Sequence, residues 1–200
     1  MSIRVIDYGA GNLWSIRNGF KRIGVSVDMA EDPEALKDAS GVILPGVGSF
    51  GDAMKRVEEF RPVIMDVVES GIPFMGVCLG IQLIFNSSGE SPEARGLGLF
   101  NGTCKRFAGV LKVPHMGWNS VRILKDTPLL EGVGDDSFFY FVHSYYPEPV
   151  DRSIIAGETE YGTTFPAIIS KDNIHATQFH PEKSGETGLK ILENFARMCR

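Results

Sequence analysis

The sequence predicts an α/β fold: a single domain around a central, mostly parallel β-sheet with helices on both faces. Two observations lead to this prediction. In the first half of the chain, short apolar runs alternate with helix-like segments, which is the pattern of β-α-β units. In the second half, strand-like runs follow one another closely, which indicates antiparallel strands that extend the sheet. The expected domain spans residues 1–200.

The elements of the first half are read from apolar spacing and from capping residues. Leu13, Ile16, Phe20 and Ile23 recur at helical spacing, and Asp32 precedes Pro33 as a helix N-cap would. Strands are expected at Ile3–Asp7, Ser26–Met29, Val42–Leu44 and Ile72–Val77. Helices are expected at Leu13–Ile23, Pro33–Asp38, Phe50–Glu58, Pro62–Ser70 and Leu79–Phe85.

The second half begins with a polar, loop-like stretch at Asn86–Arg95 and ends with an amphipathic helix at Gly185–Cys199. Between them, strands are expected at Leu99–Phe107, Ser120–Leu124, Phe138–Tyr146, Ser153–Glu158, Phe165–Ser170 and His175–Phe179. Right-handed crossovers bring the strand-to-helix loops of a parallel sheet to one edge, where ligands bind. The loops at Gly9, at Pro45–Gly48 and at Cys78 should therefore share that edge.

Composition and charge argue against several kinds of function. The net charge is −5 and no block of Lys or Arg stands out, which disfavours nucleic-acid binding. No apolar run approaches the roughly 18 residues of a membrane span, and the N-terminus is typical of a first strand rather than a signal peptide. The three cysteines are widely spaced, with no pattern of zinc ligands. We expect a cytoplasmic protein without a metal.

The segment Gly76-Val77-Cys78-Leu79-Gly80 has the pattern of a nucleophile elbow, with cysteine in the place of serine. Such a strand-to-helix turn is crowded, and the glycines at its two ends supply the room that it needs. The turn also places the sulfur at a helix N-terminus, which favours the reactive thiolate. The alternative is a buried core cysteine, and a partner base is needed to decide between the two.

A candidate base stands near the C-terminus, in the segment His180-Pro181-Glu182. The histidine ends an apolar run, and the proline limits the freedom of the backbone between the base and its carboxylate. If this strand lies parallel to and near the one before Cys78, the three side chains form a nucleophile, a base and an orienting acid. The alternative is a histidine with only a structural hydrogen bond. His175 should point to the opposite face of its strand.

These residues resemble the class I (triad) glutamine amidotransferases, whose fold is flavodoxin-like, and the resemblance covers essentially the whole chain. Within that family it is greatest to the glutaminase subunits of imidazole glycerol phosphate synthase in histidine biosynthesis. Beyond the elbow with Gln82 and the His-Pro-Glu segment, four stretches carry it: Ile6–Leu13, Pro45–Phe50, Pro114–Asn119 and Tyr140–Tyr146. Pro114–Asn119, which reads Pro-His-Met-Gly-Trp-Asn, is the most specific of them.

The resemblance implies that Cys78 attacks the side-chain amide of L-glutamine, that His180 moves the proton and that Glu182 orients His180. A γ-glutamyl thioester would form, and water would then release glutamate. Oxyanion donors are expected at the backbone of Leu79 and in the loop at Val47 and Gly48, although that loop is equally well explained as a strand-ending turn. The resemblance further implies that Gln82, Ser144 and Tyr145 bind substrate, and that no metal or organic cofactor is needed.

The resemblance also implies a partner, the (β/α)8-barrel cyclase subunit of a heterodimeric synthase, which uses the ammonia to form imidazole glycerol phosphate and an aminoimidazole carboxamide ribonucleotide. Asn12 and Trp118 are the expected interface residues, although Trp14 and Trp118 are also explained as core tryptophans. The loop Asp7–Asn12 fails as a dinucleotide fingerprint because position 14 is Trp.

Three alternative functions remain open at the level of sequence: a glutaminase for another synthase, a stand-alone cysteine hydrolase, and a binding module without activity. A further hypothesis concerns the glycine loop at Gly46-Val47-Gly48. Its backbone can turn an oxyanion donor toward or away from the site. The isolated chain should then be a poor glutaminase until its partner arrives.

Overall fold

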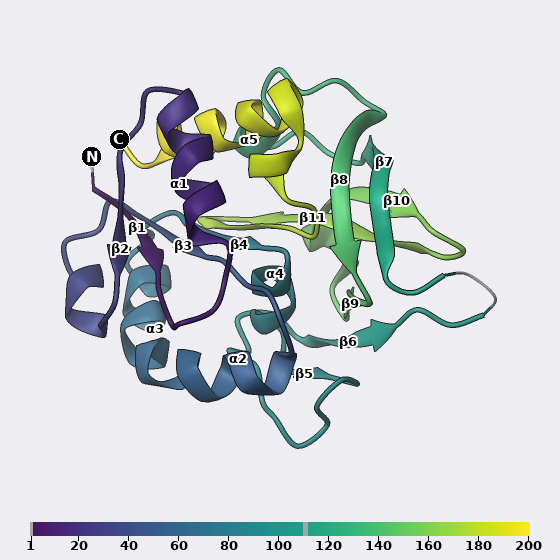
Figure 1. Cartoon of the computed structure of the whole chain (residues 1–200), viewed down its shortest axis with the longest axis horizontal. Coiled ribbons are helices and arrows are strands. Elements are labelled where there is room, and N and C mark those ends of the chain that lie inside the picture. The colour runs from purple at the N-terminus through teal and green to yellow at the C-terminus, as the bar shows by residue number, and fades with distance from the viewer. Residues whose placement is uncertain (1, 110–111) are drawn as a thin grey trace.

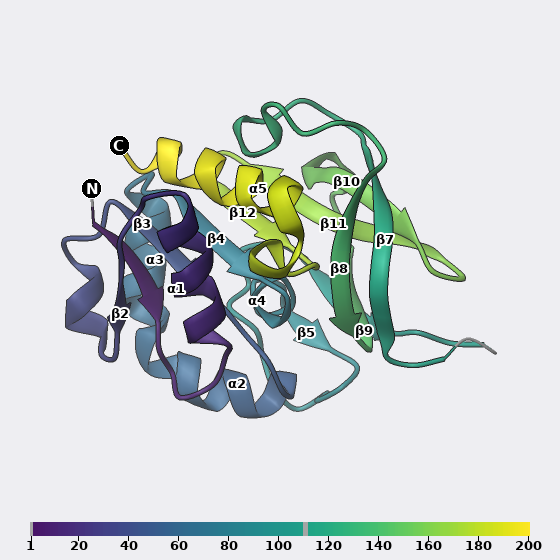
Figure 2. The ribbon, with the colours of Figure 1, turned by 45° about the horizontal axis from the view of Figure 1, so that its top comes forward.

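The computed structural model describes residues 2–109 and 112–200. Its main sheet runs through the whole molecule in the strand order β2-β1-β3-β4-β12-β11-β10-β7-β8, and a smaller sheet has the order β5-β6-β9. Figures 1 and 2 show the main sheet between two layers of helices, with β7, β8 and β10 at the end far from β2. The predicted α/β fold, with its mostly parallel centre and antiparallel extension, is confirmed.

The parallel part of the main sheet contains five strands: β1 (Ile3–Ile6), β2 (Val27–Ala30), β3 (Gly41–Leu44), β4 (Phe74–Val77) and β12 (Ile174–Thr177). The antiparallel part contains β7 (His115–Ile123), β8 (Ser137–His143), β10 (Ile155–Glu160) and β11 (Thr164–Lys171). The smaller sheet is made of β5 (Ser87–Ser88), β6 (Gly102–Arg106) and β9 (Tyr145–Pro149).

The helices fall into two layers. On one face lie α1 (Leu13–Arg22) and α5 (Gly185–Met198), whose apolar side chains share one core cluster with Val5, Met75 and the aromatic residues of the antiparallel strands. On the other face lie α2 (Phe50–Val57), α3 (Arg61–Glu69) and α4 (Leu79–Leu83), which pack in a second cluster with Ile6 and Phe74. Alternate residues of each central strand thus face different helix layers, which explains their near-continuous apolar runs. The short 3-10 helices are η1 (Pro33–Leu36), η2 (Glu58–Phe60), η3 (Pro128–Leu130), η4 (Arg152–Ile154) and η5 (Pro181–Lys183).

The position of β12 decides where the candidate base lies. β12 is the last strand in the sequence but sits in the middle of the sheet, parallel to β4 and antiparallel to β11. Its residue Thr177 is in register with Val77, the residue before Cys78. The segments that follow β4 and β12 therefore emerge at the same edge, as the sequence argument required.

Two elements differ from the sequence prediction in ways that shape this edge. The helix after Cys78 ends at Leu83 rather than Phe85, because the N–H groups of Leu97, Gly98 and Phe100 take the carbonyls of residues 83–85. The expected strand Phe138–Tyr146 is broken into β8 and β9. The break falls at Ser144, whose carbonyl accepts from the N–H of Phe107, and β9 then pairs with β6 instead of the main sheet.

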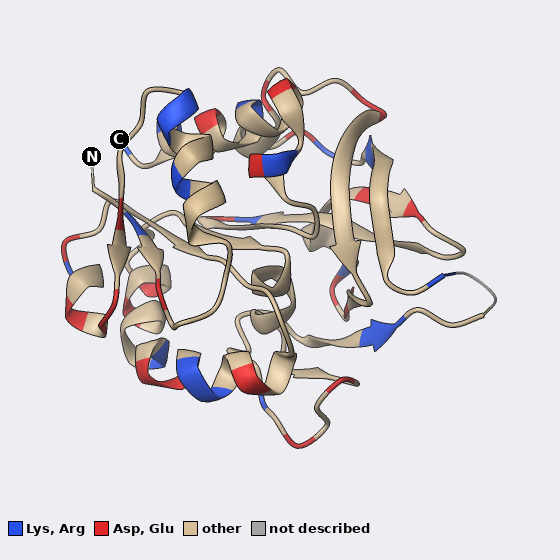
Figure 3. Ribbon diagram, in the orientation of Figure 1, with Lys and Arg blue, Asp and Glu red and all other residues tan. Residues whose placement is uncertain are grey.

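Charged residues lie mainly on the outer helices and loops, while β3, β4 and β8 contain no Lys, Arg, Asp or Glu (Figure 3). Signs are mixed across the surface, as expected for a chain of small net charge. In the part of the chain that the structure describes, no helix is long and apolar enough to span a bilayer.

Candidate active site

Cys78 stands on a strained turn between β4 and α4. Its φ of 56° and ψ of −105° lie in a region that side chains other than glycine rarely adopt. A Cβ atom on Gly80 would lie 2.1 Å from the carbonyl oxygen of Leu44, and one on Gly76 would lie 2.8 Å from the backbone of Gly80. Only glycine fits at either position, so the local sequence builds the crowded elbow that its pattern predicted.

His180 and Glu182 flank Pro181 at the end of β12 and the start of η5. The Nδ1 atom of His180 donates to Oε1 of Glu182 at 2.8 Å, and both side chains are buried. The other ring nitrogen, Nε2, is buried without a hydrogen-bond partner among the residues that the structure describes. A base held by a carboxylate at one nitrogen and free at the other is the arrangement that proton transfer at a nucleophile needs.

The environment of His180 favours the protonated imidazole. Burial by itself lowers the pKa of His180, but the neighbouring Cys78 and the carboxylate of Glu182 raise it, and they prevail, bringing the pKa to about 10. At neutral pH the ring is therefore ready to give a proton to a leaving group. Cys78 is only 6% exposed, and its Sγ lies 3.8 Å from the carbonyl oxygen of Val142.

A cavity of about 310 Å³ brings these groups together. Cys78 and His180 line it, and so do the residues that the sequence argument proposed for the oxyanion and the substrate, namely Val47, Gly48, Leu79, Gln82, Ser144 and Tyr145. The volume is at the lower end of the range for small-molecule sites, which suits a ligand of amino-acid size. Glu182 stands behind His180, outside this lining.

The two proposed oxyanion donors do not both face the cavity in this structure. The N–H of Leu79 points at the carbonyl oxygen of Gly46, at an N···O distance of 3.4 Å. The same peptide bond carries the N–H of Val47, and the C=O and N–H of a trans peptide point in opposite directions. The N–H of Val47 therefore points away from the N–H of Leu79. Gly48 has a φ of 95° and open space around its Cα, so the loop has the freedom to turn.

The Gln82 side chain lies in a short polar chain under the cavity. Its Nε2 donates to the carbonyl oxygen of Tyr145 at 2.9 Å and faces Oε1 of Gln178 at 3.5 Å. Gln178 in turn donates to the carbonyl oxygen of Cys78 at 3.5 Å. Gln82 is only 4% exposed, so it is not a solvated position on the outside of α4.

Two charged residues that line the cavity, Glu90 and Lys183, were not among the predicted site residues. A carboxylate oxygen of Glu90 accepts from the N–H of Phe50 at 2.6 Å, which ties the polar stretch after α4 to the start of α2. Its sequence neighbours gave no signal, because an isolated acidic residue in a polar loop is usually solvated. Lys183 directly follows the triad candidate Glu182 in η5. This position next to Glu182 was the sequence signal that could have placed Lys183 at the site.

The proposed interface residues lie on the outside. Trp118 is 56% exposed on β7 and Trp14 is 69% exposed on α1, so the explanation of either as a core residue is wrong. Asn12 has a local role as well, because its side-chain oxygen accepts from the N–H of Ser15 and caps α1. Asn12 does not line the cavity.

The described residues contain no group of three or more His, Cys, Asp or Glu side chains placed to hold a metal ion. Cys104 and Cys199 are buried and free, and burial raises the pKa of each thiol, that of Cys199 to about 12. Neither is a reactive cysteine in this setting. His175 bonds to Ser170 inside the sheet and, as expected, lies outside the cavity lining.

Comparison with known proteins places this site in a family. A family model described as Glutamine amidotransferase class-I matches residues 4–199. Two relatives, both named Imidazole glycerol phosphate synthase subunit HisH, are each 49% identical to this chain: one from Halobacterium salinarum, over 99% of this chain and 94% of its own length, and one from Methanothermobacter thermautotrophicus, over 99% of both.

Solved structures agree on the fold at much lower identity. PurLQS from Thermotoga maritima is 18% identical and covers 100% of this chain and 99% of its own, with a TM-score of 0.78. The glutaminase domain of Trypanosoma brucei CTPS, solved with bound acivicin, is 15% identical and covers 98% of this chain and 94% of its own, with a TM-score of 0.66. From the match across residues 4–199 and from relatives this similar over nearly the whole length, the chain belongs to the class I glutamine amidotransferases.

Proposed function

We propose that this chain is the glutaminase subunit of an imidazole glycerol phosphate synthase, hydrolysing L-glutamine and delivering the ammonia to a cyclase subunit in histidine biosynthesis. The observation that carries the proposal is the 49% identity, over 99% of the chain, to proteins that bear that synthase's name. The cavity between Cys78 and His180 supports it, because nucleophile and base line a space of the right size for glutamine.

In the proposed reaction, Cys78 attacks the carboxamide carbon of glutamine and forms a γ-glutamyl thioester. His180, held through Nδ1 by Glu182, takes the thiol proton of Cys78 at Nε2 and gives it to the departing ammonia. Water then attacks the thioester with His180 as the base, and glutamate leaves. The raised pKa of His180 supports its part as proton donor in the first step.

The tetrahedral intermediates need two donors for their oxyanion, and we assign these to the N–H groups of Leu79 and of the Val47–Gly48 loop. The carbonyl of Gly46 now faces the N–H of Leu79, so the loop must turn before both donors point into the cavity. This resting arrangement supports the hypothesis that the isolated chain is a poor glutaminase.

Substrate recognition is assigned to Gln82, Ser144, Tyr145 and Glu90, which line the cavity. A glutamine molecule carries an α-ammonium group, and the carboxylate of Glu90 is the acidic side chain at the cavity that suits it. The Gln82 amide and the backbone at Ser144 and Tyr145 offer hydrogen bonds to the rest of the substrate.

We assign the docking of the (β/α)8-barrel cyclase to the edge of the molecule that carries Asn12 and Trp118. Exposed aromatic side chains of this kind are enriched in interface cores, and Met116 and Phe138 on β7 and β8 are exposed as well, at 62% and 60%. Three free, separate cysteines support a reducing, cytoplasmic setting.

The test is an assay of glutamate release by the purified chain, with and without the cyclase subunit and its nucleotide substrate. We expect slow release by the chain alone and an increase of at least about 100-fold in the complex, the lower end of what one added oxyanion donor supplies. Imidazole glycerol phosphate should form in step with glutamate. A fully active isolated chain contradicts the resting-loop hypothesis, whereas no release under any condition contradicts the proposed function.

A further inference from the structure

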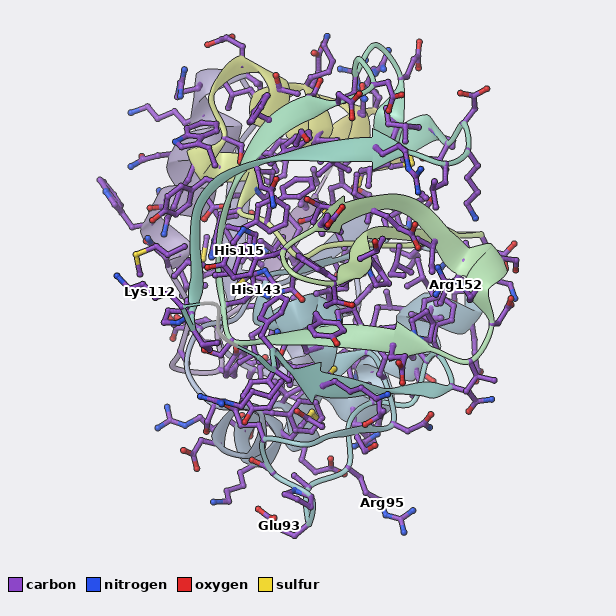
Figure 4. The ribbon with its side chains drawn as sticks, turned by 90° about the vertical axis from the view of Figure 1, so that its right-hand side faces the viewer. Glu93, Arg95, Lys112, His115, His143 and Arg152 are labelled. Carbon is purple, nitrogen blue, oxygen red and sulfur yellow. The ribbon has the colours of Figure 1, made fainter. Side chains whose placement is uncertain are left out.

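Two buried histidines beside the cavity have no part in the proposed reaction. His115 begins β7 and His143 ends β8, where they are opposite each other in the antiparallel ladder. Nδ1 of His115 lies 3.1 Å from Nε2 of His143, and the two side chains lie next to each other in Figure 4. His115 is 3% exposed and His143 is 6% exposed.

The neighbours of these rings determine which nitrogen carries each hydrogen. Nδ1 of His143 lies 2.8 Å from the carbonyl oxygen of Tyr145, which can only accept, so Nδ1 is the donor and Nε2 the acceptor. Nδ1 of His115 must then donate to His143. The remaining nitrogen of His115 accepts from the amide of Asn119 at 3.4 Å, and that amide also donates to the carbonyl oxygen of Glu160 at 2.8 Å.

Both rings stay neutral under physiological conditions, so this order of donors and acceptors persists. Burial lowers the pKa of His115 to about 4 and that of His143 to about 3. His143 lines the cavity, yet both of its ring nitrogens are committed to protein partners. Its side chain therefore offers glutamine no free polar atom.

The chain of hydrogen bonds ends on a residue that faces the substrate. The Tyr145 carbonyl accepts from His143 on one side and from Nε2 of Gln82 on the other. Because a carbonyl only accepts, Gln82 must turn its NH₂ group to Tyr145, and Gln178 takes the second hydrogen. Among the residues described, nothing donates to the Gln82 amide oxygen, which is left as an acceptor for an N–H group of the ligand.

We propose that His143 and His115 are positioning residues: they hold the Tyr145 carbonyl in place and thereby fix the orientation of the Gln82 amide for binding glutamine. The inference rests on the proposed function and assigns to that site two residues that touch neither the reacting carbon nor the thiol. Their contribution is to substrate binding, so it falls on KM rather than on kcat.

The experiment measures glutamate release by the complex with the cyclase subunit, as kcat and KM for glutamine. His143→Phe keeps an aromatic ring against Phe107 and Phe165 but removes both nitrogens. We expect KM to rise about tenfold, the effect of losing one buried hydrogen bond, with kcat within about threefold of the wild type. His143→Asn keeps a donor at the place of Nδ1 and should restore most of the wild-type KM.

A double-mutant cycle with Gln82→Ala tests the route of the effect. If His143 acts through Gln82, His143→Phe has little further effect on KM once the Gln82 amide is gone. His175→Phe is the matched control, because His175 is also buried, neutral and bonded through Nδ1, but to Ser170 outside the cavity. It should lower the thermal stability without changing KM.

The proposal is overturned if His143→Phe leaves KM unchanged, or raises it equally with and without the Gln82 amide. If His143→Phe does not fold, His115→Phe decides the matter, since the new ring keeps the stacking on Phe141 and Tyr161 and removes the donor to His143. We expect a rise of about threefold in its KM, and an unchanged value overturns the proposal. The measurement on the wild-type complex distinguishes failure of the proposed function from failure of the positioning role. A wild-type complex that releases no glutamate contradicts the proposed function itself.

Discussion

The parallel and antiparallel parts of the main sheet contribute different things to the cavity. The parallel part ends in the groups proposed for the reaction: Cys78 follows β4, and His180 follows β12. The antiparallel part supplies the opposite wall through Val142 and His143 of β8, and on its outside it carries the exposed Trp118. Chemistry and recognition are thus divided between two kinds of strand arrangement.

The difference follows from how the two parts are held. Strands β3, β4 and β12 of the parallel part are buried on both faces between helix layers, and their ends are constrained by backbone contacts such as that of Gly80 with Leu44. Strand β8 forms the edge of the sheet, β7 lies next to it, and both keep one face partly in solvent. A reacting pair needs the first environment, whereas a docking surface needs the second.

The largest effect is expected from the parallel part. Cys78→Ala should reduce glutamine-dependent turnover by the complex at least about 10³-fold, because the thioester cannot form. Turnover supplied with ammonia should be unchanged, since the partner would carry out that step. Cys104→Ala is the control, a buried cysteine outside the cavity lining. Residual glutaminase activity in Cys78→Ala would remove Cys78 from the mechanism.

Replacing one glycine by alanine in each part of the main sheet compares how well the two parts tolerate an added Cβ atom. Gly80→Ala forces a Cβ to within 2.1 Å of a backbone carbonyl, whereas Gly157→Ala in β10 meets side-chain methyl groups of Val121 at 2.9 Å and Ile168 at 3.2 Å. We expect the first to lower the free energy of unfolding by about 3 kcal/mol or more and the second by about 1 kcal/mol. Urea denaturation measures both, and equal losses would contradict the claim that the elbow is the more rigid region.

The pH dependence of stability should differ in sign between two buried histidines near the centre of the sheet. The folded pKa of His180, about 10, lies above its ordinary value of 6.5, so its stabilising contribution is complete below pH 6.5 and is lost as the pH rises toward 10. The folded pKa of His175, about 4, is depressed by burial, so its contribution improves as the pH rises from 4 to 6.5. Differences in unfolding free energy between the wild type and His180→Gln or His175→Gln, measured across pH, should show these opposite slopes.

The smallest effect on the fold is expected on the antiparallel edge. Trp118→Ala should change the free energy of unfolding by less than about 0.5 kcal/mol, because the side chain is mostly exposed. It should weaken binding of the cyclase subunit about 30-fold, as loss of an interface tryptophan typically does. Val150→Ala, exposed at the far end of β9, is the control that should leave binding unchanged. Unaltered affinity in Trp118→Ala would move the interface elsewhere.

The parallel half and its contribution to the site could be predicted from sequence because the signals are local. The run before Cys78, the flanking glycines and the adjacent His180 and Glu182 each act within a few residues. The remaining requirement was that β12 lie beside β4, and an apolar strand ending in His-Pro made that arrangement reasonable. The elbow around Cys78 and the strand that ends in His180 depend on steric fit and on the direction of the chain, and both can be inferred from the local residue pattern.

The antiparallel half was predicted less well because its structure depends on distant partners. Nothing in the run Phe138–Tyr146 indicates a break at Ser144; the break exists because β9 pairs with β6. The buried pair His115 and His143 had no acidic neighbour in sequence, and their partners become evident only when β7 and β8 are side by side. Glu90 likewise reaches the cavity through a loop whose path is set by α2.

The place of β12 in the sheet has a consequence for how the protein is made. Cys78 and Gln178, which hydrogen-bond across the β4–β12 junction, are 100 residues apart, so the central strand pairing closes a very long loop. Such non-local pairing forms late in folding. During synthesis, the half of the chain that bears the Cys78 thiol has to remain without its proposed base until the residues through Glu182 have left the ribosome. A chain that ends before His180 therefore holds Cys78 without its proposed base, and we expect that it cannot consume glutamine.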